Sequence, residues 1–180
     1  MPMSQVYLGF GSNVGDRLQN IITATHKLSA NNLIKDCSSI WETSPWGLEQ
    51  QEDFLNCVIL FETNLSPFTL IEAIGKIEHS LGRKKEQKFG PRTIDIDILF
   101  FDTLIINTPT LIVPHPLLHR RKFVLLPLSE IAPTEVKPPL LHPILKKEIN
   151  ELMEDLASNE TCHLFIPADR FRCLINTHQV

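Results

Sequence analysis

The amino-acid sequence predicts an α+β fold, an antiparallel sheet with helices packed on its faces. Three observations support this prediction. Segments rich in β-branched and aromatic residues indicate strands, two segments with apolar residues three and four positions apart indicate helices, and glycine, proline or serine residues separate them. Their order along the chain, β-α-β-β-α-β, is typical of the ferredoxin-like fold.

The first three elements lie before residue 44. Residues 6–10 (VYLGF) predict a strand, and the glycine-containing stretch after them predicts a turn. A helix is expected from about Asp16 to Ser29, with one largely apolar face made of Leu18, Ile21, Ile22, Thr25 and Leu28. Residues 33–43 (LIKDCSSIWET) predict the second strand.

The next three elements complete the predicted core. Residues 53–63 (DFLNCVILFET) predict a strand. Ser66 and Pro67 have the residue types of an N-cap and a first helical position, and Gly82 ends the helix that they begin. Residues 91–102 (PRTIDIDILFFD) contain the last strand. We expect the first and last strands to lie side by side at the centre of the sheet.

The chain continues beyond this core. A short strand is expected near residues 104–106, a helix from about Phe123, and another helix around residues 144–156. We divide the sequence into a main domain, residues 1–156, and a C-terminal extension of unknown role, residues 157–180.

Length and composition exclude several classes of protein. The chain has 180 residues, enough for one domain with a substantial core, and 43% of them are hydrophobic. Its formal net charge of −4 gives no global electrostatic case for binding nucleic acid or an anionic membrane. No signal-peptide pattern or apolar run of transmembrane length is visible, so we expect a cytoplasmic protein without disulfides.

Two aspartates interrupt the last predicted strand. Side chains alternate along a strand, so Asp95 and Asp97 point to one face while Ile94, Ile96 and Ile98 point to the other. The two carboxylates are then roughly 7 Å apart at the backbone. Such a pair is tolerated where a cation lies between the charges or where the face is wet. A divalent-metal site and a solvated edge strand are the two interpretations.

Two basic segments strengthen the first interpretation. Residues 83–92 (RKKEQKFGPR) hold five basic residues against a single acidic one and lead directly into the aspartate pair. Residues 114–123 (PHPLLHRRKF) bring together two histidines and three basic side chains before an apolar helix. Cations beside paired carboxylates are typical of phosphoryl-transfer sites. Taken singly, each segment is equally consistent with a solvated surface.

Two further segments leave alternatives open. Gly9, Gly11 and Gly15 match neither the dinucleotide fingerprint nor a Walker loop, so they indicate a structural turn; the alternative is a tight turn whose backbone approaches a ligand or a neighbouring loop. Phe54 and Asn56 share one face of a predicted strand, where an aromatic ring and an amide can stack on a flat heterocycle and bind its edge. Taken alone, they are more typical of a core.

Several motifs together resemble one enzyme family. They are G-S-N after the first strand, T-x-P-x-G followed by F-L-N, G-R before the basic segment, G-P-R-x-x-D-x-D, and V-P-H followed by R-x-F. In this order and spacing, from about residue 5 to residue 133, they resemble the hydroxymethyl-dihydropterin pyrophosphokinases of folate synthesis. The stretch Gly90–Asp97 is the most specific of them.

The resemblance implies a reaction and its cofactors. It implies a kinase-like transferase that moves pyrophosphate from ATP to the hydroxymethyl group of 6-hydroxymethyl-7,8-dihydropterin and releases AMP. Asp95 and Asp97 would bind two Mg²⁺ ions, which favour carboxylate and phosphate oxygens. Asp97 would also help to deprotonate the attacking hydroxyl; the alternative is that a bound metal lowers the pKa of that hydroxyl and makes a protein base unnecessary. Apart from the two substrates, we expect neither nucleic acid nor a membrane as a partner. The chain is expected to be a monomer that makes weak contact with neighbouring folate-pathway enzymes.

The resemblance also implies roles for individual residues. Arg83 and Arg92 fall on the catalytic arginines of a loop that closes over the triphosphate. The nucleotide site would be completed by Lys85, Phe89, His115 and Arg121, with Glu78 and the backbone of Ile98 near the adenine and ribose. The pterin would lie between Phe54 and Phe123, with its edge bound by Asn56 and by main-chain groups around Thr43, Pro45 and Trp46.

This sequence departs from the family pattern in the basic segment and beyond residue 156. Phe89 stands where a tryptophan is common, Gly75 stands where a glutamine is frequent, and the basic segment is one residue shorter than in some members.

Paired carboxylates also suit a nucleotidyl transferase, a cyclase or a glycosyltransferase, and a similar sheet binds RNA in other proteins. An RNA-binding sheet would need aromatic residues on the face that carries Asp95 and Asp97.

Overall fold

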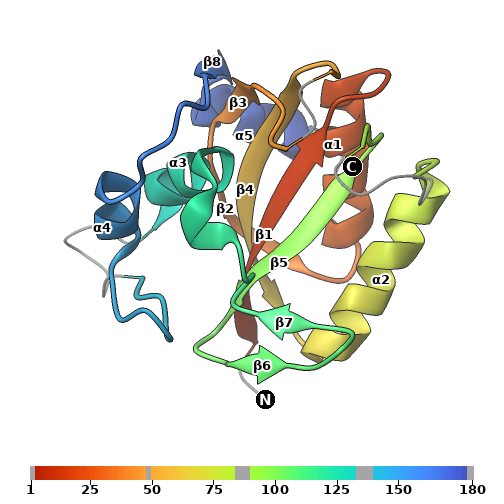
Figure 1. The fold of residues 1–180 in the computed structure, drawn as a ribbon. Helices are drawn as coiled ribbons and strands as arrows, with labels where there is room; N and C mark the ends of the chain where they lie inside the picture. Colours follow the sequence, from red (N-terminus) through yellow and green to blue (C-terminus); the bar gives the residue numbers. More distant parts are fainter. Residues whose placement is uncertain (1–2, 48–49, 84–89, 133–139, 178–180) are drawn as a thin grey trace.

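A computed structural model describes residues 3–47, 50–83, 90–132 and 140–177 of the chain. Their sheet has six strands in the order β5-β1-β4-β3-β8, with β2 also paired to β4. Helices α1, α2 and α5 cover one face and α3 and α4 the other, which confirms the predicted α+β, ferredoxin-like fold (Figure 1). No helix in these parts has the length and hydropathy needed to span a bilayer.

The boundaries of the elements follow the chain. The strands are β1 (Ser4–Ser12), β2 (Leu33–Cys37), β3 (Ile40–Thr43), β4 (Phe54–Thr63), β5 (Asp95–Phe101), β6 (Ile106–Asn107), β7 (Ile112–Val113) and β8 (Cys162–Ile166). The helices are α1 (Arg17–Ser29), α2 (Pro67–Ser80), a 3₁₀ turn (Leu118–Arg120), α3 (Lys122–Ile131), α4 (Ile149–Glu154) and α5 (Ala168–Asn176).

The predicted start of α1 near Asp16 and the predicted N-cap and end of α2 are confirmed. The side chain of Asp16 accepts a hydrogen bond from the amide of Gln19 at 3.0 Å, and the Ser66 hydroxyl accepts one from the amide of Thr69 at 3.1 Å. Each bond satisfies an amide that the first helical turn leaves without an intrahelical partner. Gly82 follows α2 with φ +82°, a left-handed conformation that glycine adopts without steric cost.

The position of β5 corrects one prediction. β5 lies beside β1, as expected, but it is an edge strand of the sheet and not a central one. The crossover through α2 returns the chain to the side of β1 that faces away from β4, so β5 becomes the outermost strand. The chain before the 3₁₀ turn approaches it there, since the amide of His115 donates to the carbonyl of Leu99 at 3.1 Å.

Three other predicted elements differ from the structure. The predicted strand over 33–43 is two strands, because the Ser38 hydroxyl accepts from the Val58 amide and interrupts the regular ladder. The short strand near 104–106 begins at Ile106 and pairs with β7. The helix predicted around 144–156 is confined to α4, because His142 Nδ1 accepts amide hydrogen bonds from Ile144 and Leu145 and holds a turn there.

The described part of the C-terminal extension packs against the core. β8 pairs antiparallel with β3, and α5 lies against α1 and β2. Phe171 and Ile175 of α5 are completely buried in the same apolar cluster as α1 and α2. These residues therefore add to the core, while the functional division at residue 156 stays a prediction.

This packing predicts that α5 is needed for stability. Phe171→Ala should lower the free energy of unfolding by about 3–5 kcal/mol, because it leaves a cavity in the core. Phe165→Ala on β8 is the matched control, since that ring is 43% exposed and its loss should cost less than about 1 kcal/mol. Urea unfolding measures both. Equal losses would contradict the burial of α5.

Candidate active site

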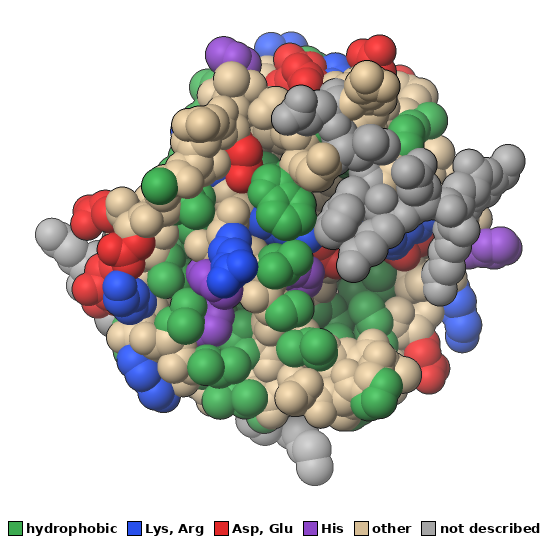
Figure 2. Space-filling model, in the orientation of Figure 1, with side chains coloured by type: hydrophobic (Ala, Val, Ile, Leu, Met, Phe, Trp, Pro, Cys, Tyr) green, Lys and Arg blue, Asp and Glu red, His purple; other side chains and the backbone are tan. Residues whose placement is uncertain are grey.

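The described residues form a pocket on the α3 face of the sheet, between β1, β3, β4, β5 and the start of α3. Figure 2 shows hydrophobic, basic and histidine side chains close together on the face of the molecule that it draws. Most of the site residues predicted from the sequence line the pocket together: Thr43, Trp46, Phe54, Asn56, Arg92, Asp95, Asp97, His115, Arg121 and Phe123.

The floor of the pocket is a row of backbone and short side chains. The predicted structural turn is wrong for Gly9 and Gly11: both belong to β1, where they pair with Asp97 and Asp95, and both line the pocket. A Cβ at Gly11 would lie 2.9 Å from the Oδ1 atom of Asn56, so only glycine leaves the Asn56 amide in place. The predicted alternation is confirmed, since Ile94, Ile96 and Ile98 are buried on the opposite face.

Arginines neutralise the carboxylate of Asp95. Arg92 Nη1 contacts one carboxylate oxygen, and Arg83 Nη2 lies 2.7 Å from the other. Arg83 also pairs with Glu78 through its second terminal nitrogen. The two arginines that flank the basic segment therefore meet at the start of β5, where negative charge is concentrated.

Glu78 lies beneath this group and does not line the pocket. Its carboxylate accepts a hydrogen bond from the Ile96 amide at 2.8 Å, and it is only 8% exposed. Burial raises the pKa of Glu78, while the ion pair with Arg83 opposes that rise. In this structure Glu78 joins the end of α2 to β5 and to Arg83.

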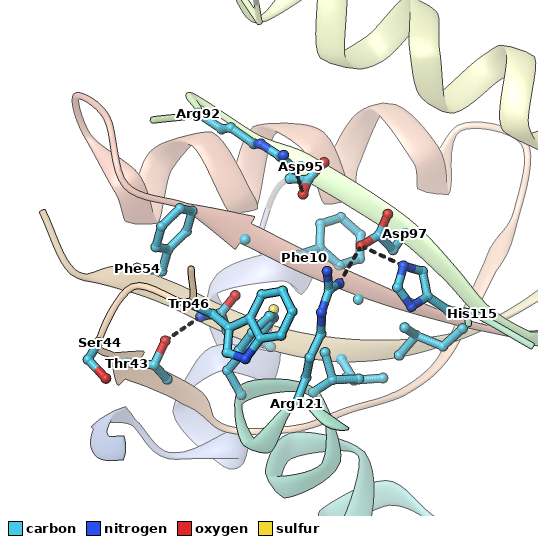
Figure 3. Close-up of a pocket in the computed structure, with 18 of the residues that line it drawn as sticks. Phe10, Thr43, Ser44, Trp46, Phe54, Arg92, Asp95, Asp97, His115 and Arg121 are labelled. Carbon is cyan, nitrogen blue, oxygen red and sulfur yellow. Dashed lines mark hydrogen bonds and ion pairs between the residues drawn. The ribbon is translucent and has the colours of Figure 1, made fainter. Parts of the chain in front are cut away.

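Asp97 lies next to His115 and Arg121 at the other end of the floor (Figure 3). Its Oδ2 atom is 3.7 Å from His115 Nε2 and 3.9 Å from Arg121 Nη1. Burial and the charge of Asp95 raise the pKa of Asp97 to about 7. Burial and the charge of Arg121 lower the pKa of His115 to about 4, so its imidazole is neutral at neutral pH.

The tautomer of His115 follows from its hydrogen bond. Its Nδ1 atom accepts from the amide of Leu117 at 3.3 Å, so the proton of the neutral ring is on Nε2. His115 therefore presents an N–H donor to the pocket beside Asp97.

Aromatic rings and an amide form the remaining wall. The guanidinium carbon of Arg121 lies 4.9 Å from the ring centre of Trp46 and 5.5 Å from that of Phe123. Asn56 Nδ2 donates to the Thr43 hydroxyl at 2.7 Å, which fixes the orientation of the amide. Flat apolar surface and oriented polar groups thus adjoin the charged floor, an arrangement suited to a heterocycle.

The remaining predicted residues have different positions. Pro45 and Arg83 are not among the residues that line the pocket, and the side chain of Ile98 is buried in the core. The predicted roles of Lys85 and Phe89 lie outside the described residues. The roles of Glu78 and of the Ile98 backbone near adenine and ribose stay predictions.

Sequence reasoning missed the role of Asn13. The side-chain Oδ1 atom of Asn13 accepts from the backbone amide of Arg92 at 2.7 Å, and the backbone amide of Asn13 donates to the Arg92 carbonyl at 3.0 Å. The side-chain Nδ2 atom donates to the Glu52 carbonyl at 3.0 Å. Asn13 therefore ties the backbone of Arg92 to the loop before β4. The local signals are a buried-strand pattern that ends in the polar pair Ser12–Asn13 and the motif G-S-N that contains this pair.

The donor set of the pocket fits magnesium that arrives with a phosphate ligand. Among the described residues, no group of three or more His, Cys, Asp or Glu could hold a metal ion alone. Asp95 and Asp97 supply two carboxylates on one strand face. Mg²⁺ is commonly bound by one or two carboxylates together with substrate phosphates and water, so this incomplete set suits it.

Comparison with known proteins places the chain in a family. The model of the 7,8-dihydro-6-hydroxymethylpterin-pyrophosphokinase (HPPK) family matches residues 7–133. The chain belongs to the HPPK family. This match includes every residue named above as part of the floor and walls of the pocket.

Relatives support the assignment over a longer stretch. The chain is 42% identical over 160 residues to 2-amino-4-hydroxy-6-hydroxymethyldihydropteridine pyrophosphokinase of Aquifex aeolicus, which covers 89% of this chain and 97% of that protein. It is 47% identical over 128 residues to the Bacillus subtilis protein of the same name, covering 69% of this chain and 76% of the other.

Solved structures of HPPK proteins share the fold. The wild-type HPPK-DHPS of Plasmodium falciparum superposes with a TM-score of 0.67 at 16% identity, over 84% of this chain. The match covers 44% of that longer chain. At this level of identity the similarity supports the fold alone.

The environment of Asp97 in this HPPK chain predicts a pH-dependent stability. Because its pKa is raised from 3.8 to about 7, the folded chain holds this proton more tightly than the unfolded chain, and stability falls as pH rises through that window. The substitution Asp97→Asn should remove this loss of stability at high pH. Since 39% of the side chain is exposed, solvent reduces the effect, and we expect the Tm at pH 8 to rise by about 2 °C.

Thermal unfolding with EDTA and without nucleotide measures this effect. The gain in Tm should be much smaller at pH 4, where Asp97 is protonated in the folded chain and about half protonated in the unfolded chain. Glu72→Gln on the exposed face of α2 is the control and should give no such trend. A constant Tm difference between pH 4 and pH 8 would contradict the assignment to Asp97.

Proposed function

We propose that this pocket transfers the pyrophosphoryl group of ATP to 6-hydroxymethyl-7,8-dihydropterin, giving AMP and the pterin diphosphate in folate biosynthesis. Membership of the HPPK family supports the activity. The location of the active site is supported by the observation that paired carboxylates, arginines and aromatic rings line one pocket. ATP would lie at the charged end and the pterin at the aromatic end.

The charged end contains the groups that we assign to the triphosphate. Arg83 and Arg92 now contact Asp95, and a guanidinium binds a phosphate with the same forked donors that bind a carboxylate. Arg121 and the Nε2–H group of His115 adjoin Asp97. These side chains can therefore turn from a carboxylate to phosphate oxygens without leaving the site.

Asp95 and Asp97 are assigned to magnesium, and two ions are proposed. When bound, Mg²⁺ neutralises phosphate charge and polarises the bonds to phosphorus. The carboxylates themselves hold negative charge in place until the metal and the nucleotide arrive. In the absence of both, Arg83 and Arg92 supply the compensating positive charge to Asp95.

The aromatic end is assigned to the pterin. Phe54 and Phe123 line the pocket from β4 and from α3, and we propose that the bicyclic ring stacks between them. Asn56, held by Thr43, and main-chain groups around Thr43 and Trp46 would bind the ring edge. The environment of these groups suits a flat ring with hydrogen-bonding edges.

The reaction then follows from the two ends. The hydroxymethyl oxygen attacks the β-phosphorus, the bond from that phosphorus to the oxygen bridging the α-phosphate breaks, and AMP leaves. Asp97 has a raised pKa, so its carboxylate is a stronger base than an ordinary aspartate and is assigned the hydroxyl proton. Arg83 and Arg92 neutralise the charge that develops during transfer.

The proposal extends to the state of the chain in the cell. We expect a monomer in the cytoplasm, where ATP is supplied, with weak contact to other folate-pathway enzymes as its only protein partner. The name HPPK-DHPS of the similar structures indicates that such enzymes occur joined in one chain.

Separation of the nucleotides after a reaction tests the proposed function. With ATP, Mg²⁺ and the reduced pterin alcohol, the wild-type chain should form AMP and pterin diphosphate in equal amounts. Asp95→Ala and Asp97→Ala should each lower turnover by at least about a hundredfold, because each removes charge stabilisation of the transition state. Release of pyrophosphate would instead indicate a cyclase or nucleotidyl transferase, and unchanged ATP a glycosyltransferase.

The arginines should affect chemistry more than binding. Arg83→Ala and Arg92→Ala should each lower kcat by at least about tenfold and change the KM for ATP by less than about threefold, because their charge is needed most in the transition state. Arg120→Ala is the matched control, since Arg120 belongs to the second basic segment but does not line the pocket. A raised KM with an unchanged kcat would make Arg83 and Arg92 binding residues only.

A further inference from the structure

The segment after α4 contacts the pocket although it lies beyond the residues matched by the family model. That match ends at residue 133. Residues 160–162 nevertheless contact the start of α3 and the end of β3, which both contribute side chains to the pocket. The contacts are hydrogen bonds between residues far apart in sequence.

Glu160 satisfies the start of α3. No side chain from α3's own N-cap position, Arg121, bonds the amides of the first turn. The Oε2 atom of Glu160 accepts from the Phe123 amide at 3.1 Å, and the ammonium group of Lys122 donates to the Glu160 carbonyl at 3.4 Å. A carboxylate at a helix N-terminus both satisfies an orphan amide and interacts favourably with the helix dipole.

The side chains on either side of this bond enter the pocket. Arg121 and Phe123 both line it, and their guanidinium and ring are in contact. The charge of Glu160 also acts on Arg121, whose pKa it raises against a larger lowering by burial. A shift of the first turn of α3 would therefore move both groups at once.

The next residue is tied to the opposite wall. The amide of Thr161 donates to the Ser44 hydroxyl at 3.2 Å, and the Ser44 amide donates to the Thr161 carbonyl at 3.2 Å. Cys162 then pairs with Thr43 in the β3–β8 ladder. Thr43 and Ser44 line the pocket (Figure 3).

We propose that Glu160 is a positioning residue for the pterin end of the pocket. Through Glu160 and Thr161 the C-terminal segment joins the wall at Thr43–Ser44 to the wall at Phe123, and so sets the spacing between them. A stacked, edge-bonded ring depends on that spacing, because small displacements of binding groups weaken every contact together. The inference rests on the proposed function, which places the pterin there.

Steady-state kinetics of Glu160 variants test the proposal. Glu160→Ala should raise the KM for the pterin by about tenfold while kcat changes by less than about twofold, because ring binding and not transfer is impaired. The KM for ATP should change by less than about threefold. Glu160→Gln keeps an oxygen that accepts from the Phe123 amide, so it should restore most of the wild-type value.

A variant elsewhere in the extension separates positioning from general stability. Arg172→Ala removes the ion pair between α5 and Asp36, whose atoms are 2.5 Å apart, and neither residue lines the pocket. Arg172→Ala should leave the KM values for the pterin and for ATP unchanged, even if its Tm falls as far as the Tm of Glu160→Ala. Equal effects of Glu160→Ala and Arg172→Ala on the pterin KM would overturn the proposal.

The outcome also distinguishes this proposal from the proposed function. If the wild-type chain forms AMP and pterin diphosphate and Glu160→Ala keeps the wild-type KM for the pterin, the positioning role alone is wrong. If the wild-type chain forms neither product, the proposed function fails before any variant is compared. Equilibrium titration of the pterin with a non-hydrolysable ATP analogue should show the same loss of affinity in Glu160→Ala.

Discussion

The pocket depends on a central strand that has no side chains on one stretch of its face. β1 pairs with β5 on one side and β4 on the other, and at Gly9 and Gly11 it leaves space above the sheet. Asp97 and Asp95 flank this space from β5, and Val58 and Asn56 flank it from β4. Larger residues on β1 would fill the space where the substrates are proposed to meet.

The opposite face of the same strands packs in the core and holds the floor of the pocket in place. Ile94, Ile96 and Ile98 pack with α1 and α2 in the main core, so the backbone that carries the aspartates is held by buried apolar surface. Because close packing of the isoleucine face holds the strands in place, the opposite face can carry the mutually repelling carboxylates of Asp95 and Asp97. Asp95 is compensated by Arg83 and Arg92, whereas burial and the charge of Asp95 raise the pKa of Asp97.

Long-range hydrogen bonds place the walls around this floor. Asn13 joins the backbone of Arg92 to that of Glu52, Glu78 joins α2 to β5, and Glu160 joins the extension to α3. Each of these side chains is polar, satisfies backbone amides and connects segments that are distant in the chain. The site is therefore held by groups that lie mostly behind the residues expected to touch the substrates.

The sequence by itself determined the order of elements, the face of Asp95 and Asp97, and the family, because strand and helix periodicity and short motifs are local properties. Tertiary structure decided that β5 is an edge strand and that Pro45 and Glu78 do not line the pocket. It also decided that Asn13 and Glu160 support the site. Their partners lie up to 79 and 38 residues away, and a hydrogen bond across such a distance leaves no periodic pattern in the chain.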